Sequence, residues 1–273
     1  MTKHTALICT IISVATLAIP WHTSRAFDYQ LATLETPSPD RPAIPSHGPT
    51  GYSNPATGNY LSGSADDPLA EFTRRPLDEY IIPEGGLFMD PLHNGPHYGI
   101  DYTNPDDYLN GRPIWVYPIG PGYVTTRSSC LLCFVDGDWM GSIPSQAPQY
   151  NFGFGGMVVT ETPFSPEVSI YIMYAHLARD SVSLGDYITP RESIAVAGNT
   201  GYSEEIHLHL EVRFGRPGAF WNADFSDPGT MDRWLNTDLV TPAMLIYPEY
   251  HASFVTYIEE WVAVQPVIDD SLP

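Results

Sequence analysis

Basic residues are scarce in this chain, and lysine is almost absent. The 273 residues include 12 Lys and Arg but 32 Asp and Glu, so the formal net charge is −20, and the only lysine is Lys3. A surface of this sign repels nucleic acids and anionic membranes, so we expect neither as a partner. The charge favours solubility and does not bear on the fold.

Long apolar runs are also scarce, and the one that stands out lies at the N-terminus. Residues 1–26 place Lys3 before the stretch ALICTIISVATLAIP, and the small residues Ser24 and Ala26 follow it. This order is typical of a secretory signal peptide, and the run is shorter than the roughly 20 residues that span a bilayer. Cleavage after Ala26 would remove Lys3 and Arg25 but no acidic residue, which changes the net charge from −20 to −22. We predict a signal peptide at 1–26 and an extracytoplasmic protein, periplasmic or secreted, without stable membrane insertion after cleavage; an uncleaved anchor is the alternative.

Cysteine is rare as well, and only Cys130 and Cys133 would remain after export. The pair lies in the stretch SSCLLCF, where half of a zinc site would lack its other two ligands and no βα redox context is visible. In an oxidising compartment such a pair favours a disulfide. We therefore predict a local disulfide with a structural role.

The remaining chain divides by composition. Residues 27–76 are rich in Pro, Ser and Gly, which is typical of a linker or an extended arm. Short β-prone runs such as GYVTTRS, GMVVTETPF and VSIYIMYAHL then alternate with Gly and Pro turns. Helical periodicity is scarce outside a short candidate after Pro242. The pattern predicts a mainly β domain over 77–248 and a C-terminal tail over 249–273.

Histidines gather in the β-prone part of the chain. His207 and His209 are two apart in EIHLHLEVRFG, so they share one face of a strand. His97 lies four residues before Asp101 in PHYGIDY, and His176 ends the run YIMYAHL. Two imidazoles and one carboxylate with an open fourth position form a common catalytic zinc site. Spacing alone leaves open which residues are ligands, and each taken singly also fits a surface or buried structural residue.

Several motifs in order resemble the M23 family of zinc metallopeptidases, of the lysostaphin and LytM type. They are HYGID, GRPIWVYPIGPGYV, YAHL, SLGDYITPRESIAVAGNTGYS and IHLHLEV, and together they cover roughly residues 77–248. The resemblance implies a mainly β fold with an antiparallel β-sheet core of the duplicated hybrid motif type. It also implies long loops that form a groove.

Carried over position by position, the resemblance implies that His97, Asp101 and His209 bind one Zn²⁺ per chain. It implies that His176 and His207 are catalytic histidines that do not bind the metal, and it leaves open which is the general base. The implied reaction is hydrolysis of peptide bonds in peptidoglycan cross-links or bridges by zinc-activated water, carried out by a monomer. His93 and His251 have no motif position, and we expect them at the surface.

A different class of function is a non-catalytic M23-like protein that regulates another cell-wall hydrolase. Such proteins lose ligands or catalytic histidines, whereas this chain keeps all five. A metallopeptidase acting on soluble Gly-rich proteins is a third possibility that the motifs do not distinguish. An inhibitory arm that reaches the zinc through His47, Asn54 or Asn94 is a further hypothesis.

The chain between Asp101 and His176 is longer than the family core needs. The extra length carries several aromatic residues: Phe134, Trp139, Tyr150, Phe152 and Phe154. These side chains could form a wall of the substrate groove, or they could form a small separate core under a long loop.

Overall fold

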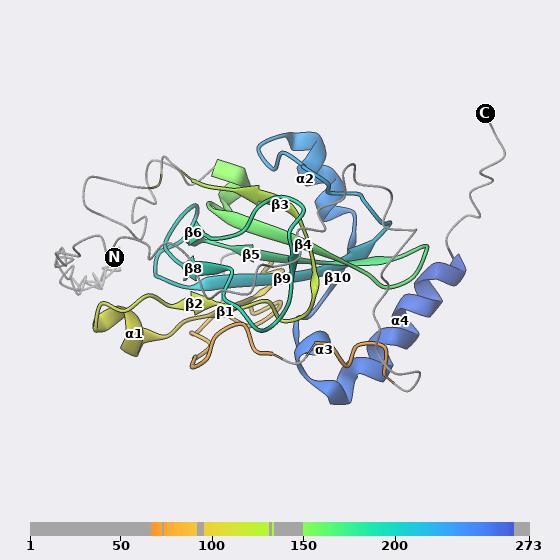
Figure 1. Cartoon of the computed structure of the whole chain (residues 1–273), viewed down its shortest axis with the longest axis horizontal. Coiled ribbons are helices and arrows are strands. Elements are labelled where there is room, and N and C mark those ends of the chain that lie inside the picture. Colours follow the sequence, from red (N-terminus) through yellow and green to blue (C-terminus); the bar gives the residue numbers. More distant parts are fainter. Residues whose placement is uncertain (1–66, 73, 92–95, 131–132, 134–149, 265–273) are drawn as a thin grey trace, which may run out of the picture.

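The computed structural model describes residues 67–72, 74–91, 96–130, 133 and 150–264, and two antiparallel sheets dominate it (Figure 1). The seven-stranded sheet has the order β1 (Ile100–Tyr102), β9 (Leu208–Gly215), β5 (Ser169–Ala175), β4 (Met157–Pro163), β3 (Gly122–Ser128) and β7 (Tyr187–Ile188), and β10 (Asp238–Val240) also pairs with β9. The three-stranded sheet has the order β2 (Trp115–Val116), β8 (Ala195–Ala197) and β6 (Leu177–Asp180). The predicted mainly β class with an antiparallel core is confirmed.

Helices are few and short in the described part of the chain. They are α1 (Pro105–Leu109), α2 (Pro228–Leu235), α3 (Ala243–Ile246) and α4 (His251–Val264), with 3₁₀ turns η3 (Tyr150–Gly153) and η4 (Pro248–Tyr250). None of the described helices is long and apolar enough to cross a membrane. The predicted signal peptide at 1–26 lies outside the described residues.

The central strand β5 is buried on both faces, which explains why its sequence is a continuous apolar run. Ile172 and Tyr174 belong to the larger core, which also contains Phe254 of α4. The alternate residue Met173 belongs to a second cluster, which contains Trp234 of α2. Figure 1 accordingly shows α2 and α4 on opposite sides of the sheet. The sheet is therefore the middle layer, with a packed core on each face.

Residues from both predicted flanks pack into this core. Leu69 and Phe72, from the stretch predicted as an arm, are fully or almost fully buried. Phe254 and Ile258, from the predicted tail, are buried four residues apart on one face of α4. The part of the chain that packs together thus extends beyond 77–248 at both ends, and the domain boundaries themselves stay a prediction.

The expectation that His251 lies at the surface was wrong. Its side chain is buried, with Nδ1 2.9 Å from the carboxylate of Asp67 and Nε2 2.8 Å from the carbonyl oxygen of Leu245. A histidine whose two nitrogens are both hydrogen-bonded can be buried without a large desolvation penalty. His93 lies outside the described residues.

Candidate metal and catalytic site

The pairing of β9 with both neighbours brings three distant parts of the chain together. Asp101 on β1 lies directly opposite His209 on β9. On the other side of β9, His209 lies opposite Ala175, the residue before His176. Strand register therefore decides which side chains meet, and the sequence motifs alone do not state that register.

Three of the predicted residues converge on one point. Nε2 of His97 is 3.1 Å from Oδ1 of Asp101 and 3.1 Å from Nδ1 of His209, and the latter two atoms are 3.0 Å apart. Nδ1 of His97 donates to the carbonyl oxygen of Leu87, which turns Nε2 toward the cluster. Ligands about 2.0–2.1 Å from a tetrahedral zinc lie roughly 3.3 Å from one another. The two imidazoles and the carboxylate therefore fit Zn²⁺ in both type and spacing.

A buried carboxylate faces the outer side of His209. Nε2 of His209 is 3.6 Å from Oε2 of Glu211, and neither atom has a hydrogen-bond partner among the described residues. The other oxygen of Glu211 accepts from Nε of Arg213 and from Nε1 of Trp234. Metal-binding histidines commonly direct their second ring nitrogen at a carboxylate, which fixes the tautomer. Glu211 was not singled out from the sequence, although it lies two residues after His209 and hence on the same strand face.

His176 and His207 form a second pair beside this cluster. Their ring centroids are 4.6 Å apart, and Nε2 of His207 is 3.6 Å from Oδ1 of Asp101. Nδ1 of His176 donates to the carbonyl oxygen of Thr200, and Nδ1 of His207 donates to that of Glu205. These bonds assign the Nδ1–H tautomer to both neutral rings, so each Nε2 is left as a proton acceptor.

The backbone of His176 is in the left-handed region, with φ of 59°. This conformation is unfavourable for a residue with a Cβ and persists only where surrounding contacts enforce it. Its N–H donates to the carbonyl oxygen of Phe154, and its own carbonyl oxygen accepts from Gly198. These two backbone hydrogen bonds hold the main chain of His176 in this conformation and so set the direction of its side chain.

Burial and neighbouring charges shift the pKa values of the carboxylate and the histidines in different directions. Burial raises the pKa of Asp101, but hydrogen bonds from His209 and His97 outweigh it and hold that pKa well below its usual range. Burial lowers the pKa of His209, but the carboxylates of Asp101 and Glu211 outweigh it and raise that pKa to about 9. Burial, with the neighbouring histidines, lowers the pKa values of His176 and His207. The latter two are therefore neutral near pH 7 and able to accept a proton.

All five predicted residues line one cavity of about 670 Å³. Phe152 and Phe154 also line it, which is compatible with the groove-wall alternative, although Phe154 also packs against the second cluster. Tyr202 lines the same cavity with 60% of its surface exposed. Tyr202 was missed because nothing in its local sequence distinguishes it from other turn residues. Phe134, Trp139 and the side chain of Tyr150 lie outside the described residues, as do His47, Asn54 and Asn94 of the arm hypothesis.

The His97, Asp101 and His209 cluster on this mainly β fold is compatible with a bound metal ion. The sequence profile of peptidase family M23 matches residues 141–222, which confirms the resemblance inferred from the motifs. The match includes His176, His207 and His209, whereas His97 and Asp101 lie upstream of it. Over this stretch the chain is therefore similar to the M23 peptidases.

The chain is also similar to individual proteins. An uncharacterised metalloprotease of Buchnera aphidicola subsp. Baizongia pistaciae is 35% identical in an alignment of 81 residues that covers 26% of this chain and 21% of that protein. This chain therefore spans about a fifth of the length of that curated relative. A zinc-containing peptidase from Vibrio cholerae is 26% identical over 54% of this chain and 38% of its own, with a TM-score of 0.36. The catalytic domain of lysostaphin from Staphylococcus simulans is 23% identical over 50% of this chain and 81% of its own, with a TM-score of 0.34.

Proposed function

We propose that this protein is an exported, monomeric zinc endopeptidase that hydrolyses peptide bonds in bacterial peptidoglycan cross-links or bridges. One observation carries the proposal: two imidazoles and a carboxylate with spacing that suits zinc lie beside a second pair of histidines in a single cavity. The peptidoglycan substrate and the extracytoplasmic location rest on the sequence motifs and on the predicted signal peptide. In this proposal His97, Asp101 and His209 bind one Zn²⁺ per chain.

Bound zinc would supply a Lewis acid for the scissile carbonyl and would lower the pKa of water toward neutrality. The protein's own residues then move the protons. Nε2 of His176 and Nε2 of His207 are the two acceptors next to the cluster, and their lowered pKa values keep them neutral and available. One takes the proton of the attacking water, and the resulting imidazolium can protonate the leaving amine.

Asp101 and Glu211 shape the charge around these steps. Asp101 stays ionised, and its oxygen is near both His209 and His207, so it favours positive charge on either ring. The Glu211 carboxylate, 3.6 Å from Nε2 of His209, favours the orientation in which Nδ1 faces the cluster. The aromatic side chains of Phe152, Phe154 and Tyr202 offer apolar surface for a peptide chain in the cavity.

The test is a digest of purified peptidoglycan with residues 27–273, zinc-loaded and then chelated, with products identified by mass spectrometry. Zinc-dependent release of defined peptides is expected and would identify the bond as a D-Ala–diaminopimelate cross-link, a stem-peptide bond or an oligoglycine bridge. A folded protein that binds one zinc but releases nothing from cell wall or from Gly-rich proteins would favour the regulatory alternative.

Two variants separate the proposed roles. His97→Ala is expected to lose both zinc and activity because it removes a ligand. His176→Ala is expected to keep one zinc per chain while kcat falls by about 10²–10⁴-fold, the usual contribution of a general acid or base. Equal zinc loss in both variants would contradict this division of roles.

A further inference from the structure

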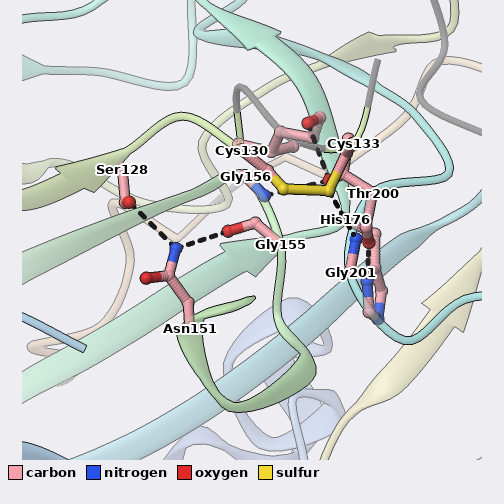
Figure 2. The surroundings of a disulfide bond; sticks show 10 residues. Ser128, Cys130, Cys133, Asn151, Gly155, Gly156, His176, Thr200 and Gly201 are labelled. Carbon is pink, nitrogen blue, oxygen red and sulfur yellow. Dashed lines mark hydrogen bonds between the residues drawn. A yellow bond between two sulfur atoms is a disulfide. The ribbon is translucent and has the colours of Figure 1, made fainter. Parts of the chain in front are cut away.

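The Cys130–Cys133 pair is a sequence motif that the proposed function leaves unused. The two residues form a disulfide, as predicted, and both are almost fully buried. Figure 2 shows the disulfide beside the turn that contains Thr200 and Gly201, with His176 on the other side of that turn. A bridge placed only to staple a loop would not need to contact the site.

A single peptide group connects the disulfide to His176. The N–H of Gly201 donates to Sγ of Cys133, at 3.2 Å. The carbonyl oxygen of Thr200 belongs to the same peptide unit and accepts from Nδ1 of His176, at 2.7 Å. In a trans peptide the C=O and the N–H point in opposite directions, so fixing one fixes the other. The sulfur therefore sets the orientation of the carbonyl that holds the imidazole.

The Thr200 side chain is fixed by its own hydrogen bonds, so the orientation of the Thr200–Gly201 peptide depends on the bonds of its N–H and C=O groups. Oγ1 of Thr200 donates to the carbonyl oxygen of Leu177 and accepts from the N–H of Gly156, both at 2.9 Å, so the Thr200 side chain is anchored. Gly201 has φ of 77° and no room for a Cβ, which would lie 2.2 Å from the carbonyl oxygen of Gly153. A peptide unit that ends in glycine reorients with little steric resistance. The hydrogen bond to Cys133 opposes that reorientation.

We propose that the Cys130–Cys133 disulfide positions His176 through the Thr200–Gly201 peptide. The sulfur holds the peptide plane, the peptide carbonyl holds the Nδ1–H tautomer, and Nε2 is thereby presented to the cavity. Cys133 is a positioning residue, since it touches neither the proposed zinc ligands nor the substrate cavity. This inference rests on the proposed function for its catalytic consequence but not for its structural one.

Two double variants test the contact, and both remove the bridge while introducing one alanine and one serine. The acceptor-retaining variant combines Cys130→Ala with Cys133→Ser, so a hydroxyl oxygen can still accept from Gly201. The acceptor-deleting variant combines Cys130→Ser with Cys133→Ala, so that acceptor is lost. With equal zinc content, we expect kcat of the acceptor-deleting variant to fall roughly 10- to 100-fold with little change in KM, as for a misplacement near 1 Å.

The acceptor-retaining variant is the matched control. We expect its kcat to stay within about threefold of that of the unmodified protein, because the peptide plane keeps a hydrogen-bond partner. Equal kcat in the two double variants would overturn the proposal.

A readout independent of activity accompanies these assays. ¹⁵N-edited NMR should show a slowly exchanging Nδ1 proton on His176 in the unmodified protein and in the acceptor-retaining variant, and its loss in the acceptor-deleting variant. If the acceptor-deleting variant does not fold, hydrogen exchange of the Gly201 amide in the unmodified protein decides, because rapid exchange would refute the bond to sulfur. Failure of the unmodified protein to cleave any peptide would refute the proposed function, while these NMR measurements would still test the positioning.

Discussion

Replacing Gly99 by alanine should damage the proposed zinc site without removing any ligand. Gly99 comes directly before β1, and a Cβ at this position would lie 2.5 Å from the carbonyl oxygen of Leu210 and 2.7 Å from Cε1 of His209. Ordinary contacts to a Cβ begin at 3.4 Å, so the neighbours would have to move by roughly 0.7–0.9 Å. Leu210 belongs to β9, which is paired on both sides and cannot retreat. The ring of His209 must therefore move, and Nδ1 moves with it.

The size of the effect follows from that displacement. A shift approaching 1 Å in a catalytic group typically costs about 100-fold in rate. We expect zinc affinity to fall by about 10- to 100-fold, similar to the loss of an interaction that orients a ligand. We also expect overpacking to lower the free energy of unfolding by about 1–3 kcal/mol.

The assay is competition for zinc with a chromophoric chelator, followed by kcat/KM at saturating zinc and by urea unfolding of the metal-free protein. The matched control is Gly215→Ala at the other end of β9, where the nearest atom to a new Cβ is the Thr237 methyl, at 3.1 Å. That side chain can yield, so zinc affinity should stay at the original value. A folded Gly99→Ala protein with unchanged zinc affinity would refute the argument that this close approach positions His209.

Three further predictions concern charge at the site. Glu211→Gln should weaken zinc binding by about 10- to 100-fold because it removes the carboxylate that faces Nε2 of His209. The control Glu167→Gln, in an exposed turn, should leave zinc affinity unchanged. Equal zinc affinities of the two variants in a competition assay would contradict this role of Glu211. The metal-free protein should be most stable near pH ~6.5, the usual pKa of histidine. As pH rises from there through the His209 pKa of about 9, the folded state loses a proton that it held more tightly than the unfolded state, so stability falls. As pH drops below about 6.5, the lowered pKa values of His176 and His207 let the unfolded state bind more protons, so stability falls again. Urea unfolding with chelator between about pH 5 and 9 measures this, and a monotonic rise toward the alkaline end would exclude it. Zinc affinity should rise about tenfold per pH unit between roughly pH 6.5 and 9, since His209 must release its proton, and calorimetry in buffers of different ionisation enthalpy should detect about one proton released.

The histidine pattern could be predicted from sequence because strand geometry is local. Alternation places His207 and His209 on one face without knowledge of any partner. The approach of Asp101 and His97 to that face depends on the register between β1 and β9, which the motifs do not state. Only the resemblance to the M23 family implied in advance that these side chains meet. The assignments of ligands and of catalytic histidines remain predictions, although the structure brings the side chains together.

Long-range partners were beyond the sequence for a physical reason. The contact between His251 and Asp67 joins residues 184 apart, and no local pattern encodes such a pair. The contact between Cys133 and Gly201 joins residues 68 apart and depends on the orientation of one peptide plane. The position of Glu211, in contrast, could have been predicted from the sequence. Side chains alternate along a strand, so Glu211 lies on the same strand face as His207 and His209.

The two faces of β9 explain how one strand can contribute to both the core and the site. One face of β9 places Leu210, Val212 and Phe214 in the larger core, which fixes the strand in register. The opposite face presents His209, Glu211 and Arg213 in sequence, so a proposed ligand is followed by a carboxylate and then by a buried guanidinium. Without metal, the excess negative charge of Asp101 and Glu211 is compensated by a proton on His209, which is why its pKa rises. A divalent cation at Nδ1 of His209 could replace the proton there and pair with Asp101, while the proton on Nε2 still faces Glu211, so the charge arrangement favours metal binding.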